Sequence, residues 1–215
     1  MSENPIEKVK VLAESAPPSV GISAAWNYGN TMFVIVLGLL LTPYQLGKLG
    51  VEFYGVIMLE MALLSIATLI NTSLVKTMVV MAGGKDALSW TDGDKIAKYA
   101  SFVVCAAGAF AAWLILPGLN IPAGGLTQAR WLMVAFCVSQ SFSIIVATSQ
   151  ARLMLCQRFD LLNKALIAGQ VVQCVVIVAL FELFRPSLVL HGLAVLAAAA
   201  TSRFLIWRYM TTYIS

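Results

Sequence analysis

Charged residues are scarce in this chain. They make up 11% of its 215 residues, against about 25% in an ordinary soluble domain. Hydrophobic residues reach 60% and the mean hydropathy is +0.88. The apolar residues come in long continuous blocks, and a helix needs about 20 of them to span a bilayer. Continuous blocks favour helices over the alternating strands of a barrel. The sequence therefore predicts an all-α polytopic membrane bundle.

Residues that carry chemistry are also few. The chain has one histidine, ten acidic residues and four cysteines, without a CxxC pair or a Walker motif. Asp86, Asp92 and Asp94 share one predicted loop, but no histidine or glycine-rich phosphate cradle accompanies them. We therefore expect no enzymatic activity, no cofactor and no metal site. The cysteines are interpreted as small buried hydrophobes.

Basic residues exceed acidic ones and give a net charge of +4. They sit at the ends of apolar blocks, as membrane topology requires, and form no stripe with interleaved aromatics. This placement argues against a nucleic-acid partner and in favour of the lipid bilayer as the surroundings of the chain.

Six spans are predicted after a polar tail. The tail, residues 1–20, is expected in the cytoplasm, either as a short helix on the membrane surface or as a disordered segment. Pro43 and Pro117 are expected to end the first and third spans. The predicted spans cover residues 22–44, 53–80, 96–116, 126–155, 161–184 and 188–207.

The distribution of basic residues predicts the orientation of these spans. Eleven of the fourteen lysines and arginines fall on the side of the tail, and three fall on the other side. Because cytoplasmic loops are enriched in lysine and arginine, both termini are expected inside.

Polar side chains form stripes on four of the six predicted spans, the first, second, fourth and fifth. One interpretation is that the amides bond helix to helix. The other is that the four spans line a water-filled path, which Glu60 favours because an intramembrane carboxylate needs a partner or water. The third and sixth spans are expected to serve packing or to face lipid. The candidate path residues are Asn27, Asn30, Glu60, Asn71, Gln140, Gln150, Gln170 and Gln173.

Short stretches of the chain resemble a known family. Leu39–Pro43, Leu46-Gly47, Tyr54-Gly55 and Cys156–Asn163 are similar to segments of Wzx-like O-antigen and oligosaccharide flippases. These belong to the multidrug/oligosaccharidyl-lipid/polysaccharide exporter superfamily. An Asp-x-Gly motif that is frequent in their second helix is absent here, where Ala67–Asn71 takes its place.

Flippases of this family have twelve to fourteen helices in two lobes, so the resemblance implies a single lobe. It implies a half-transporter in the bacterial cytoplasmic (inner) membrane that works by alternating access with a second lobe, as a homodimer or with a separate chain. A polyprenyl-linked sugar is the implied substrate. The candidates for contacts with its pyrophosphate are Lys76, Arg152 and Arg203.

Other functions remain open at this point. The leading one is a membrane scaffold or assembly partner in cell-surface glycan synthesis that transports nothing. A truncated, inactive flippase and an exporter of small solutes are further alternatives. The scaffold predicts dry, packed polar stripes, whereas a transporter predicts stripes that reach water.

Overall fold

The computed structural model describes residues 20–83, 90–118, 121 and 124–213, and within them it is helical with no strand. The predicted tail, except for Val20, lies outside these ranges, and so does Asp86 of the predicted loop. The helices are α2 (Val20–Leu49), α3 (Val51–Gly83), α4 (Trp90–Leu114), α5 (Gly125–Ile145), α6 (Ala147–Leu155), α7 (Phe159–Leu183) and α8 (Leu188–Tyr213), with a 3-10 turn η1 (Leu116–Gly118).

Five of these helices, α2, α3, α4, α7 and α8, are long and apolar enough to cross a membrane. The predicted all-α membrane bundle is confirmed. The expected fourth span consists instead of α5 and α6, which are bent by 44° relative to each other at Val146. α5 has 21 residues and α6 has nine. Joined through Val146 as one straight helix, they would be about 46 Å long. That exceeds the roughly 30 Å hydrocarbon core, but length alone does not require the bend, because α3 forms one helix of 33 residues.

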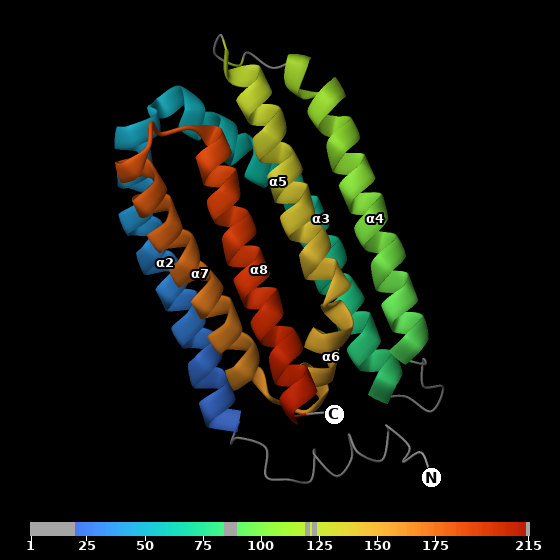
Figure 1. Ribbon diagram of the computed structural model, residues 1–215. Coiled ribbons are helices and arrows are strands. Elements are labelled where there is room, and N and C mark those ends of the chain that lie inside the picture. The colour runs from blue at the N-terminus through green and yellow to red at the C-terminus, as the bar shows by residue number, and fades with distance from the viewer. Residues whose placement is uncertain (1–19, 84–89, 119–120, 122–123, 214–215) are drawn as a thin grey trace.

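The helices pack side by side in an order that differs from their order in the chain (Figure 1). α2 packs on α7, α7 on α8, α8 on α5, and α5 on α4. α3 starts beside the end of α2 and diverges from it to pack against α5 and α6. The first residues of α2 and the last of α8 lie at the same end of the bundle.

A single residue, Gly50, joins α2 to α3. Its φ of +82° lies in the left-handed region where glycine is favoured. The expectation that the first span ends at Pro43 is wrong, because α2 continues to Leu49. Transmembrane helices tolerate an internal proline since neighbouring groups satisfy the freed backbone carbonyl. The extra turns of α2 place Gln45 within the span.

Glycines allow the helices to approach closely. A Cβ atom on Gly169 of α7 would lie 2.9 Å from the Ala198 carbonyl oxygen of α8. On Gly192 of α8 it would lie 3.0 Å from the Cβ of Ala135 of α5. Small residues at interfaces are the usual means by which helices associate in lipid, where no hydrophobic gain is available.

Gly169→Ala should therefore destabilise the bundle, because the added methyl group meets backbone of α8. Overpacking of this kind costs about 1–3 kcal/mol, and we expect a thermal midpoint in detergent several degrees lower. Gly55→Ala is the matched control, since nothing lies within 4 Å of its Cβ position in α3. Equal midpoints for the two variants would contradict close packing of α7 on α8.

Candidate functional site

A pocket of about 260 Å³ lies in the angle between α2 and α3, with α7 and α8 closing it. It sits at the end of the bundle where Gly50 joins α2 to α3. Apolar side chains such as Leu41, Ile57 and Met61 form much of its wall. Its polar members come from four helices and are Thr42, Gln45, Tyr54, Gln170, Gln173 and His191.

Two pairs of polar side chains in the pocket contact each other. The Thr42 and Tyr54 hydroxyls lie 3.2 Å apart and share a hydrogen bond between α2 and α3. Gln45 Nε2 lies 3.5 Å from His191 Nδ1, a long contact between α2 and α8. Each of these pairs bridges α2 to another helix around the pocket.

His191 is the most enclosed polar residue of the pocket. It is only 2% exposed, and its ring lies 6.1 Å from that of Phe136. Its Nε2 is buried and has no hydrogen-bond partner among the described residues. An unpaired polar atom in an apolar interior is costly. Since this nitrogen is itself buried, the pocket as it stands does not offer it to water.

Two of the predicted path residues, Gln170 and Gln173, line this pocket. Gln45 and His191 were missed by sequence reasoning. Gln45 lies beyond the expected end of the first span, although it continues the helical spacing of Gly38 and Thr42. His191 lies near the start of α8. As expected, α8 packs extensively, on α7 and α5, and it also contributes His191 to the pocket.

Asn27 lies at the other end of α2 and joins that helix to α7. Its Oδ1 accepts a hydrogen bond of 2.7 Å from Asn163 Nδ2. Near the opposite end of the same pair, Glu182 accepts a hydrogen bond from Tyr44 and forms an ion pair with Lys48, both at 2.9 Å. α2 is thus fastened to α7 at both ends, and Asn27 has a packing role.

A third polar group joins α3, α5 and α8 away from the pocket. Ser143 Oγ accepts hydrogen bonds from the Arg203 guanidinium and, at 3.4 Å, from Asn71 Nδ2. Arg203 Nε and Asn71 Oδ1 remain buried without a partner in the described part of the chain. The polar residues predicted to line one path therefore fall into separate groups in different parts of the bundle.

Glu60 belongs to none of these groups. Its side chain is fully buried in α3, and neither carboxyl oxygen has a hydrogen-bond partner among the described residues. Ile57 and Leu64, one turn away on either side, belong to the apolar core. An ionisable residue inside a membrane span is a functional candidate by its position alone.

The remaining predicted residues lie outside the pocket. The Arg152 guanidinium stands 4.8 Å above the Trp90 ring, and its Nη1 lies 3.9 Å from Met210 Sδ. Asn30 and Gln140 are partly buried, Gln150 is buried, and Lys76 is exposed. Within the described ranges, no three histidine, cysteine, aspartate or glutamate residues gather to hold a metal ion.

Comparisons with family models, with curated proteins and with solved structures found no match to this chain.

The pocket should be reached by water and small polar reagents, which its native cysteine can report. Cys174 lines the pocket, whereas Cys105, also partly buried, lies on α4 outside it. A small charged thiosulfonate should label the wild type, and Cys174→Ala should remove most of that labelling. Cys105→Ala should leave it unchanged.

Filling the pocket should reduce the labelling of Cys174, as removing its thiol does. Gly38 lines the pocket and has no atom within 4 Å of its Cβ position, so Gly38→Leu fits and narrows the space. Gly29→Leu is the matched change on α2 outside the pocket. Labelling of Cys174 that is equally fast in both variants would show that the reagent does not enter through this pocket.

The Asn27–Asn163 hydrogen bond should contribute measurably to the stability of the bundle. A double-mutant cycle with Asn27→Ala and Asn163→Ala should give a coupling of about 0.6 kcal/mol, and no more than about 2, as for other hydrogen bonds between membrane helices. Reversible unfolding in mixed micelles measures it. Strictly additive effects would mean that the two amides do not interact in the membrane.

Proposed function

We propose that this chain is one six-span lobe of a transporter that moves lipid-linked oligosaccharides across a bacterial cytoplasmic membrane. The observation that carries the proposal is the pocket that Gln45, Gln170, Gln173 and His191 line between membrane-spanning helices. A bundle that only packs has no need of an open space lined by amides. Secondary transporters bind substrate between membrane helices.

The chemistry of the pocket suits a sugar. An amide side chain both donates and accepts hydrogen bonds, as a sugar hydroxyl does, so three glutamines can satisfy several hydroxyls at once. His191 Nε2 adds a buried group without a partner among the described residues. The apolar remainder of the wall suits the faces of a sugar ring. The lipid tail of the substrate would remain in the bilayer.

The size of the pocket fits the proposal of a single lobe. Its volume of about 260 Å³ lies below the roughly 300–1,000 Å³ of complete ligand pockets. An oligosaccharide would therefore extend beyond it, and a second lobe would supply the opposite wall. α2 leaves much of its surface free, with Tyr28 75% and Leu39 72% exposed. This surface is available to lipid or to a second lobe.

Arg203 stays a candidate for the pyrophosphate, but it lies outside the pocket, about 18 Å along α8 from His191. Its Nε is buried and without a partner in the described part of the chain, and a serine rather than a carboxylate accepts its hydrogen bond. A buried guanidinium without a carboxylate is suited to bind an anionic group. Arg152 and Lys76 stay as further candidates for this role.

The rival function is a membrane scaffold in glycan synthesis. It is favoured by the hydrogen bonds Asn27–Asn163 and Asn71–Ser143, which join helices and lie outside the pocket that Gln45 and His191 line. In that case these hydrogen-bonded residues serve assembly, and the pocket binds no substrate.

Flipping in vesicles tests the proposal. The purified protein in its native oligomeric state would be placed in vesicles that contain a fluorescent polyprenyl-pyrophosphate sugar. An impermeant quencher then reports the rate of flipping. The variant Gln45→Leu/Gln170→Leu/Gln173→Leu should be at least tenfold slower than the wild type, because its pocket keeps its volume but loses its hydrogen bonds.

Gln140→Leu is the control, since Gln140 lies on α5 outside the pocket. It should flip at the wild-type rate. A wild-type protein that flips no faster than protein-free vesicles, in any oligomeric state, would favour the scaffold. Unchanged flipping by the triple variant would place the substrate path elsewhere.

A further inference from the structure

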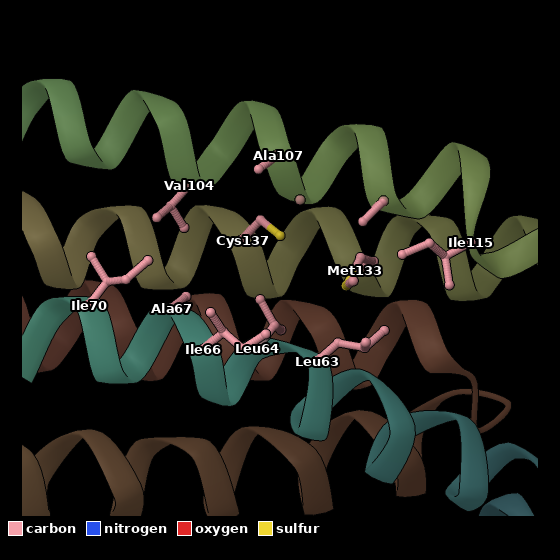
Figure 2. Close-up of a pocket in the computed structure, with 12 residues that line it drawn as sticks. Leu63, Leu64, Ile66, Ala67, Ile70, Val104, Ala107, Ile115, Met133 and Cys137 are labelled. Atoms are coloured by element: carbon pink, nitrogen blue, oxygen red, sulfur yellow. The ribbon is translucent and has the colours of Figure 1, made fainter.

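A second pocket differs from the first in lacking polar side chains. It is a crevice of about 240 Å³ between α3 and α4, with α5 as its floor. Figure 2 shows its side chains directed into the space between the helices. Apart from the Cys137 thiol its lining is entirely apolar. The members that matter here are Leu64, Ala67, Ala107, Gly108, Met133 and Cys137.

The space of the crevice remains unfilled because small residues line both of its walls. α4 packs mainly on α5, α3 packs on α5 and α6, and α3 and α4 have little contact with each other. Ala67 faces the space from α3, and Ala107 and Gly108 face it from α4. A Cβ atom on Gly108 would lie 1.9 Å from Cys137 Sγ. The absence of this Cβ brings α4 close to α5 at the base of the crevice.

The crevice opens into the hydrocarbon region of the membrane. Its walls belong to helices that span the bilayer. The rim residues Ile66 and Ile115 are 63% and 45% exposed, and Phe110 nearby on α4 is 67% exposed. The crevice is therefore continuous with the exposed apolar surface of α3 and α4.

We propose that this crevice binds one hydrocarbon chain of a membrane lipid. An apolar cavity of about 150 Å³ stays free of water in a soluble protein and takes up small apolar molecules. This crevice is larger and faces a medium without water. If it were empty, its walls would lose their van der Waals contacts on one side. A hydrocarbon chain restores those contacts and needs no polar partner.

The dimensions of the crevice favour a chain over a helix from another protein. On α3 the lining runs from Leu63 to Ile70, about two turns or 10 Å. A transmembrane helix is about 10–12 Å wide and about 30 Å long within the bilayer core, so it would extend well beyond this lining. The volume equals that of about eight water molecules, which suits a short stretch of one chain. This inference does not rest on the proposed transport function.

A photoreactive phospholipid with a diazirine midway along one acyl chain tests the inference. The wild-type protein in lipid nanodiscs should give adducts concentrated on Leu64, Met133 and Cys137, the inner residues of the crevice. Ala107→Phe fills the space and should reduce these adducts at least fivefold. Ala106→Phe adds the same ring one residue away, outside the crevice, and should leave them unchanged.

Ala67→Leu fills the crevice from α3 and provides a second variant should Ala107→Phe fail to fold. Equal yields of inner adducts for filled and control variants would overturn the proposal, since they would reflect ordinary contact with bulk lipid. It would also be overturned if the inner residues gave no adducts while a dimer of the wild type dissociated in Ala107→Phe. That result would assign the crevice to a protein partner.

Discussion

The interior of a bilayer offers no water to a polar group, and this constraint governs the whole structure. The backbone satisfies it by forming helices throughout the described membrane spans. Hydroxyls satisfy it locally: Thr72 and Thr201 each donate to a carbonyl one turn earlier. Amides satisfy it across helices, as Asn163 does with Asn27. Only a few buried side-chain polar atoms of the described residues then remain without a hydrogen-bond partner.

Among the described residues, the side chains with such an unpaired atom come from five helices and are Asn30, Glu60, Asn71, Arg130, Arg152, His191 and Arg203. Glu60, His191 and Arg203 each bury a polar atom that has no partner among the described residues. Glu60 lies on α3, whereas His191 and Arg203 lie on α8, which stands between α7 and α5 (Figure 1). Of the three, His191 is the one that lines the pocket at the Gly50 corner. The corner at Gly50 creates this pocket, because α2 and α3 diverge from it and leave a space that α7 and α8 close.

Much of the fold follows from the sequence, because apolar length and composition determine where a chain crosses a membrane. Two features of the fold are exceptions. Pro43 lies inside α2, since neighbouring groups in a bundle accommodate a proline that would end an isolated helix. The bend at Val146 carries neither proline nor glycine, the usual sequence marks of a break. A pattern of side chains could not have located it.

The site could be predicted only in part, because a stripe gives the polar face of a helix but not the helix it meets. Gln170 and Gln173 were placed correctly on one face, and both line the pocket. Asn71 shares the same amide chemistry but lies where α3 has diverged toward α5, and it meets Ser143 instead. The direction in which α3 crosses the bundle decides this division, and a single helix pattern contains no information about it.

One face of α2 is expected to border water inside the membrane. A spin label placed at each position from Val34 to Gln45 in turn, with the protein in lipid vesicles, measures collision with oxygen and with a water-soluble nickel complex. If that face borders water, nickel access should rise and fall with the helical period of about 3.6 residues. Its maxima should fall at Gly38, Leu41/Thr42 and Gln45. Access to oxygen alone, uniform along α2, would contradict it.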